Sequence, residues 1–447
     1  MHPLRLAGLG LLTTTIISTA APTLAATDGE IDALKAQLEA VTKRLAELEA
    51  EQKQTKKDLA KAKQVKVVTS DTKEEVVTAG KLPNSFKLPG TDTSVKIGGF
   101  VKMDGIYDAN HAYGGQFGNF ATIPLDNSAQ ANQDAEFNAH ARNSRVNFTT
   151  LTPTEIGDLK TFVEVDFFGT DRGNPNTTNG SDLQLRHAYG QVGRVLAGQT
   201  WSNFMDLDAY PESLDYVGPV GLSFVRQAQV RYTDKIDDNW SYAMALEAPQ
   251  TSFTPTAGTK ADLSEVPDFT ARAVYKDDFG HLAFRGLARV LDANDTAIGN
   301  DDEAFGWGLG FSGKLKTFGK DTFSFSGVYG DGLGHYLLES AVTGNGSTYV
   351  NGDLDTQTVY GGYVDYMHAW TDAWRSNLIF GYSGMDNDVN RTGLAINKEV
   401  MSSHINLLWN PVPQYKAGIE YIHAYRELES GVNGELDRFQ ASFIYSF

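Results

Sequence analysis

The sequence predicts an all-β transmembrane barrel of about 16 antiparallel strands with an N-terminal α-helical coiled-coil extension. Three observations predict this fold class. Apolar and polar residues alternate along many segments, short and long connections alternate between those segments, and the composition is aromatic yet polar. The 447 residues include 44 glycines and 11% aromatic residues, and the mean hydropathy is −0.32. A barrel accommodates this polarity because only alternate residues of each strand face lipid.

The first 25 residues have the pattern of a signal peptide. Arg5 precedes an apolar run from Leu6 to Ile17, and Thr23-Leu24-Ala25 ends on a small residue, as signal-peptidase sites do. We therefore expect residues 1–25 to direct export, with cleavage near Ala25. A retained anchor helix is the alternative, although the apolar run is short for a bilayer.

Composition argues against several classes of function. The chain has no cysteine, and therefore has neither disulfides nor thiolate ligands. Its formal charge of −18 argues against nucleic acid as a partner. The histidines follow no metal-binding spacing, so we expect neither a metal nor a cofactor. No recognisable Ser/His/Asp constellation favours an enzyme, and an outer-membrane hydrolase is the weaker alternative to a protein without catalytic activity.

Residues 26–64 are predicted to form a coiled coil. Apolar residues recur at alternating steps of three and four, beginning at Ile31, Leu34 and Leu38. Gln52 would be a polar position in this seam that sets the register. Leucines in the seam weakly favour three or four strands, so we expect self-association. The alternative is a single amphipathic helix that lies on another surface.

Residues 65–92 are predicted to be a linker, because Leu82-Pro83 and Leu88-Pro89-Gly90 interrupt any regular pattern. Residues 93–447 are predicted to be the barrel. The first strand has an apolar face made by Val95, Ile97, Val101, Met103 and Tyr107, and a polar face made by Lys96, Lys102, Asp104 and Asp108. Similar alternation recurs up to the last strand, which ends at Phe447.

The connections between these segments alternate in length. Long connections are expected near 110–138, 170–181, 203–222, 249–265, 291–303 and 331–353. Short ones are expected at Asp234–Asn239, Lys276–Gly280 and Asn410–Pro413. Short periplasmic turns and long external loops are typical of bacterial outer-membrane barrels. We expect the predicted coiled coil to lie in the periplasm.

Arginines recur on the polar faces of the predicted strands. Charge on the lipid side costs roughly 2 to 4 kcal/mol at mid-membrane, so these side chains should point into the lumen. The inward set is Arg145, Arg186, Arg231, Arg272, Arg285, Arg289, Arg375 and Arg438. One hypothesis is that several of them form an electropositive ladder for carboxylate solutes. The alternative is that they pair with wall carboxylates such as Glu164, Asp166, Glu247 and Glu420 and stiffen the barrel.

Three segments resemble known outer-membrane proteins. The stretch FKLPGTDTSVKIGGFVKMDGIYD, Phe86 to Asp108, together with the preceding heptads, resembles the DcaP-like porins. The stretch LRHAYGQVGRVLAGQTWSNFMD, Leu185 to Asp206, looks like the strand pair that precedes the constriction loop of many porins. The ending FQASFIYSF, Phe439 to Phe447, resembles the aromatic terminal strand by which barrels are recognised for assembly.

This resemblance implies a homotrimer and uptake of small dicarboxylates or other anions. It also implies that the loop from Asn203 to Leu222 folds inward and sets acidic groups across from the basic wall. The acidic residues of this constriction loop are Asp206, Asp208, Glu212 and Asp215. The alternatives for this loop are an ordinary external loop and a trimer-contact loop.

The function expected from the sequence is passive diffusion of small anionic solutes, such as dicarboxylates or aromatic acids, through an arginine-lined constriction. Expected partners are two further copies of the chain, outer-membrane lipids including lipopolysaccharide, and peptidoglycan through the coiled coil. A general non-selective porin is one alternative. A structural tether between the outer membrane and the cell wall is another.

Overall fold

A computed structural model describes residues 39, 42–44, 46–50, 53–54, 77–110, 113, 119–172, 177–250, 260–261, 264–295, 300–343 and 346–447. The chain divides into two compact units, Met1–Glu74 and Glu75–Phe447.

In the first unit, the described residues between 39 and 54 are helical. Arg44 and Glu47, three residues apart, form an exposed ion pair at 2.9 Å. The predicted signal peptide (1–25), most of the predicted coiled coil (26–64) and residues 65–76 of the predicted linker lie outside the described residues. Helix is therefore seen in part of the heptad segment, and its self-association stays a prediction. Among the residues that the structure describes, no helix is long and apolar enough to cross a membrane.

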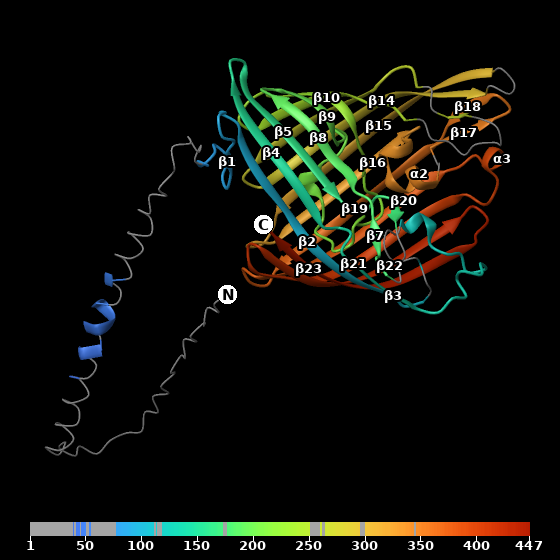
Figure 1. The fold of residues 1–447 in the computed structure, drawn as a ribbon. Coiled ribbons are helices and arrows are strands. Elements are labelled where there is room, and N and C mark those ends of the chain that lie inside the picture. Colours follow the sequence, from blue (N-terminus) through green and yellow to red (C-terminus); the bar gives the residue numbers. More distant parts are fainter. Residues whose placement is uncertain are drawn as a thin grey trace, which may run out of the picture. The chain divides into compact units, whose positions relative to one another are not determined.

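The second unit is a closed antiparallel barrel (Figure 1). Its described part contains 16 wall strands, which confirms the predicted barrel. In chain order they are β2 (Ser94–Asp108), β4 (Arg145–Thr154), β5 (Gly157–Asp166), β8 (Gln184–Val192), β9 (Val195–Trp201), β10 (Arg226–Lys235), β11 (Trp240–Glu247), β13 (Asp268–Asp277), β14 (Gly280–Asp295), β15 (Asn300–Lys316), β16 (Thr322–Asp331), β19 (Thr358–Ala369), β20 (Trp374–Asp386), β21 (Asn397–Val412), β22 (Tyr415–Leu428) and β23 (Asn433–Ser446). Pairing of β23 with β2 closes the barrel and leaves no open edge.

Short elements complete the described sheets. β1 (Phe86–Lys87) lies within the predicted linker and pairs with the beginning of β2. β3 (Glu136–His140) pairs with the second half of β2, whereas β4 pairs with its first half. β3 and β4 therefore lie end to end beside the same strand. The remaining short strands are β6 (Asp171–Arg172), β7 (Gly180–Ser181), β12 (Lys260–Ala261), β17 (Ser347–Val350) and β18 (Asp353–Thr356).

The two faces of the wall follow the predicted alternation. In β2 the side chains of Val101 and Met103 are exposed on the outer face, whereas Lys102 and Asp104 are buried inside. In β23 the aromatic residues Phe439, Phe443 and Tyr445 are exposed outside, and Arg438, Gln440 and Ser442 are buried inside. A period of two explains both strands, because successive strand residues point to opposite faces.

Short turns lie at one end of the barrel and long loops at the other. The predicted connection at 291–303 is wrong in part, because residues 291–295 and 300–303 belong to the long hairpin of β14 and β15. The Asp-rich sequence obscured these strands. Only Leu291 and Ala293 form an apolar face there, and these two residues are too few to show an alternating pattern in the sequence.

Described residues of three loops lie inside the barrel and form a hydrophobic core there. These are L1 (109–135), L3 (202–225) and L6 (332–357). Buried members of this core include Phe120 and Ile123 from L1, Phe204 and Val220 from L3, and Leu337 from L6. They pack on apolar inward-facing wall residues, namely Leu287, Val328, Val359, Met385, Val400, Ile422, Ala424 and Leu436. Part of the lumen is therefore filled with packed side chains.

Candidate functional site

L3 crosses the lumen and contacts the wall on several sides. Arg272 Nη1 in β13 donates a hydrogen bond to the carbonyl of Met205 at 2.7 Å. Lys102 Nζ in β2 donates to the carbonyl of Leu214 at 2.7 Å. Tyr363 in β19 donates to the carbonyl of Ala209 at 3.1 Å. The loop backbone is thus held by basic and hydroxyl groups from strands that lie far apart around the barrel.

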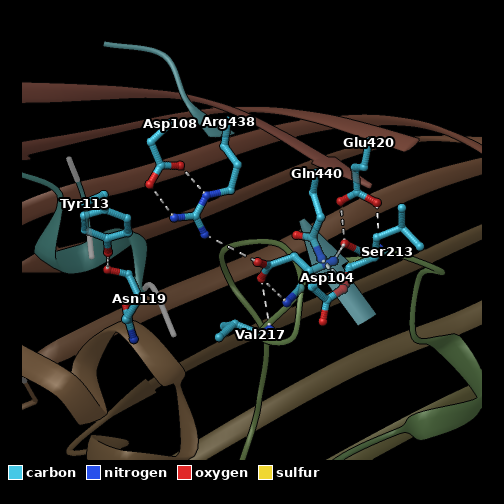
Figure 2. Close-up of polar contacts among 12 residues, drawn as sticks. Asp104, Asp108, Tyr113, Asn119, Ser213, Val217, Glu420, Arg438 and Gln440 are labelled. Atoms are coloured by element: carbon cyan, nitrogen blue, oxygen red, sulfur yellow. Dashed lines mark hydrogen bonds and ion pairs between the residues drawn. The ribbon is translucent and has the colours of Figure 1, made fainter. Parts of the chain in front are cut away.

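The second half of L3 is tied to the closing strands. Ser213 Oγ donates to Glu420 at 2.5 Å, and the backbone N–H of Leu214 donates to the same carboxylate at 2.7 Å. Gln440 in β23 donates to Asp104 in β2 at 3.0 Å and to the carbonyl of Leu214 at 2.8 Å. Figure 2 shows these contacts next to the pair of Asp108 and Arg438.

Of the acidic loop residues, Asp206 and Asp208 occupy different environments. Asp206 is buried, accepts a hydrogen bond from Ser312 at 2.7 Å and pairs with His281 at 2.9 Å. Asp208 lies exposed in the short 3₁₀ turn Leu207–Ala209. Only the carboxylate of Asp208 therefore faces solvent in this part of the loop.

Glu212 forms ion pairs with two basic side chains. Arg375 donates to both of its carboxylate oxygens at 2.6 Å, and Lys416 donates to one of them at 2.9 Å. Burial tends to raise the pKa of Glu212, but the hydrogen bond from Arg375 and the charge of Lys416 outweigh it. The pKa is consequently lowered to about 2. This carboxylate stays ionised over the whole physiological range.

Asp215 faces the lumen side of the closing strands. Its carboxylate accepts hydrogen bonds from the backbone N–H groups of Val217 and Gly218, each at 3.0 Å, and lies 3.9 Å from Arg438. Burial raises the pKa of Asp215 above its ordinary value, although the positive charge of Arg438 opposes this rise. Asp215 therefore mainly shapes the loop.

Four of the eight predicted arginines are almost completely buried. Arg186 contacts Asp166 at 2.5 Å and Glu164 at 3.0 Å. Arg438 makes a two-pronged contact with Asp108 at 2.7 and 3.0 Å (Figure 2). These contacts match the arrangement in which arginines pair with wall carboxylates.

The other two buried arginines are held differently. Arg289 lies 3.4 Å from Asp268 and donates to the carbonyl of Leu333 in L6 at 3.1 Å. Arg285 donates to the carbonyl of Phe204 in L3 at 3.0 Å. A Cβ added at Gly310, which is paired with Arg285 in β15, would lie 2.9 Å from the guanidinium. The glycine leaves the room that this guanidinium occupies.

Arg186 reaches the lumen through a β-bulge. The pairing of β5 with β8 shifts between Glu164 and Val165, and both Arg186 and the adjacent His187 are buried. A strict two-residue period would have placed these neighbours on opposite faces. A bulge inserts one residue and turns both side chains to the same side.

The remaining four arginines are partly exposed and fall into two groups. Arg231 in β10 and Arg272 in β13 lie on either side of β11, which presents buried Ala243 and Ala245 between them. Arg272 is also directly opposite Arg285 in the register of β13 and β14. The small alanine side chains leave space above the wall between Arg231 and Arg272.

Arg145 and Arg375 belong to the second group, which lines a cavity of about 490 Å³. Lys102, Lys416, Glu212 and Asp215 also line it. The sequence-based prediction missed both lysines as site residues because it considered arginines alone. Their positions on the polar faces of their strands were the signal that could have included them.

A closed 16-strand barrel with a loop folded across its lumen defines an outer-membrane porin. The model of the DcaP outer membrane protein family matches residues 54–447, and the chain belongs to this family. The resemblance to DcaP-like porins is thereby confirmed. The protein is an outer-membrane channel.

Several solved structures of outer-membrane proteins are similar to this chain. The outer membrane channel DcaP of Acinetobacter baumannii is 24% identical, with a TM-score of 0.71 over 83% of this chain and 100% of that one. The anion-selective porin from Comamonas acidovorans is 10% identical, with a TM-score of 0.49 over 79% of this chain and 100% of that one. A loop-deletion mutant of OmpT from Vibrio cholerae is 11% identical, with a TM-score of 0.49 over 79% of this chain and 99% of that one. No curated protein sequence matches the chain.

Proposed function

We propose that this channel passes small anionic solutes, such as dicarboxylates or aromatic acids, by passive diffusion through a constriction between L3 and the arginine-bearing wall. The observation that carries this proposal is that Arg231 and Arg272 lie on either side of β11, whose inward side chains between them are the small Ala243 and Ala245. The nearby carboxylate of Asp206 is occupied by Ser312 and His281. Glu247 and Asp208 also lie near these arginines, but among the described residues no ion pair joins Arg231 or Arg272 to a carboxylate, which supports attraction of a passing anion.

The eight arginines divide into two proposed roles. Arg145, Arg231, Arg272 and Arg375 are partly exposed and contact solutes. Arg186, Arg285, Arg289 and Arg438 are buried in pairs or on carbonyls, and they hold the wall and the loops in place. Guanidinium groups that their neighbours hold rigidly fix the shape of the wall around a selective pore. The two hypotheses drawn from the sequence thus apply to different members of the same set.

The assembly that we propose is a homotrimer in the outer membrane. Its apolar outer faces contact lipids, including lipopolysaccharide, and one another. The signal peptide directs export, and the heptad segment forms a periplasmic coiled coil that supports the trimer and lies close to peptidoglycan. The period of the heptads supports this arrangement.

Liposome swelling tests the proposed selectivity. Proteoliposomes should swell faster in isotonic sodium succinate or phthalate than in a neutral sugar of similar size. In the double variant R231Q/R272Q this preference should fall, because two positive charges that face the lumen are lost. R231Q alone, which keeps the hydrogen bond from Arg272 to Met205 of L3, should lower the preference by a smaller amount. Equal swelling rates for anion and sugar in the unaltered protein would favour a general non-selective porin. The absence of swelling in every solute would favour the tether.

A further inference from the structure

We propose that Arg375 and Lys416 form a carboxylate-binding site for dicarboxylates, which Glu212 of L3 fills whenever no solute is bound. This inference rests on the proposed passage of anions and names one place where they stop. The carboxylate of Glu212 would act as an internal substitute for the solute, and a permeating dicarboxylate would displace it.

The geometry around Glu212 is that of a bound carboxylate ligand. Arg375 Nε and Nη2 each lie 2.6 Å from a different oxygen of Glu212, and Lys416 Nζ lies 2.9 Å from one of them. Two parallel N–H donors that meet two oxygens are the arrangement by which arginine recognises carboxylates. Any solute carboxylate in this position could make the same three contacts.

The site is reachable from the lumen. The side chains of Arg375, Lys416 and Glu212 are 22%, 26% and 34% exposed. They line the cavity of about 490 Å³, a size within the range of small-molecule sites. Solvent therefore reaches all three side chains, and an incoming anion can approach them and exchange with Glu212.

The backbone of L3 is held independently of the Glu212 side chain. Asn406 Nδ2 donates to the carbonyl of Glu212 at 2.8 Å. The next residues, Ser213 and Leu214, are fixed by Glu420. Rotation of one glutamate side chain can therefore vacate the site while the loop keeps its place.

Arg145 supplies a partner for the second carboxylate of the solute. It lines the same cavity, and its side chain is 25% exposed. Its contacts to Glu164 at 3.6 Å and to Asn143 at 3.4 Å are long. A dicarboxylate has one charged group for the site vacated by Glu212 and another for Arg145, which a monocarboxylate lacks.

Succinate block of single channels in planar bilayers tests this site. We would compare the unaltered protein with E212Q, with E212Q/R375Q and with a matched control, E155Q. Glu155 lies exposed in the turn between β4 and β5, so E155Q changes the net charge equally and leaves the site untouched. Heat-modifiable migration in electrophoresis checks that each variant forms a barrel.

The expected result is that E212Q lowers the half-blocking succinate concentration by about tenfold, because it removes a tethered competitor whose effective concentration is in the millimolar range. E212Q/R375Q should lose this gain, acetate should show a smaller gain than succinate, and E155Q should behave like the unaltered protein. An unchanged or higher half-blocking concentration in E212Q would overturn the inference, and so would an equal drop in E155Q. The reversal potential, recorded on the same channels, tests the proposed anion selectivity separately. Anion selectivity with no effect of E212Q would refute this site alone.

Discussion

Arg438 links the two strands that close the barrel. It is 1% exposed and bonds to Asp108 with two hydrogen bonds, so the last strand is fastened to the first by side chains as well as by backbone. Asp215 of L3 lies 3.9 Å from the same guanidinium. Removal of this arginine would leave two buried carboxylates without their counter-charge.

The variant R438Q should therefore be destabilised by about 3 to 5 kcal/mol, the range for breaking a buried ion pair from one side. The readout is the temperature at which the folded electrophoretic band disappears. R194Q provides a matched control, because Arg194 pairs with Asp234 at 2.9 Å while its side chain is 63% exposed. Solvent screens that exposed pair, so R194Q should change the temperature very little. Similar losses in both variants would contradict this account of the closure.

At this scale, the alternating pattern predicted which way the arginines point but not what they touch. Arg438 and Asp108 are far apart in the sequence, and nothing local records that they meet. The β-bulge at Arg186 also escapes a strict two-residue period. The lysines Lys102 and Lys416 have the same inward parity as the arginines, but that they share one cavity is visible only in the structure.

L6 docks onto L3 through a buried acid in its short helix α2 (Leu338–Thr343). Glu339 Oε2 accepts the backbone N–H of Gly221 at 3.2 Å, and the N–H of Leu338 donates to the carbonyl of Leu222 at 3.1 Å. Burial raises the pKa of Glu339 to about 7, although the N–H of Gly221 opposes this rise. The docked loop therefore binds this proton more tightly than a released loop would.

Docking of L6 should consequently depend on pH. Docking should be strongest below pH 4.5, the ordinary pKa of a glutamate, and should weaken as the pH rises from 4.5 to 7. It should be weakest above pH 7, where Glu339 has lost its proton in the docked loop as well. Hydrogen exchange of peptides covering 217–224 and 334–340, corrected for intrinsic rates, should show lower protection at pH 8.5 than at pH 5.5. E339Q should remove this difference. Equal protection of the unaltered protein at both pH values would rule out the effect.

The positions of the loops inside the barrel could not be predicted from the sequence pattern. The two-residue alternation of apolar and polar residues predicts the wall strands, but Phe120 in L1 and Leu337 in L6 belong to no regular pattern. Their burial depends on the barrel that surrounds them. The inward course of L3 was likewise implied by the family resemblance and not by any period in its residues.

The whole molecule combines a lipid-facing surface with a lumen that the loops divide. Apolar inward side chains of the wall from β14 to β23 pack against L1, L3 and L6. The partly exposed arginines Arg231 and Arg272 lie outside that hydrophobic core, on β10 and β13. The path of a solute should therefore run past these two side chains and past the cavity that Arg375 and Lys416 line. Net charge is no guide to this path, since the chain as a whole carries −18.

The reversal potential of the purified channel in a planar bilayer under a potassium chloride gradient tests this account most directly. Basic side chains on the solute path predict a potential of the sign for chloride preference, and R231Q/R272Q should move it towards zero. A potential of the opposite sign in the unaltered protein, meaning preference for potassium, would contradict an anion-selective constriction.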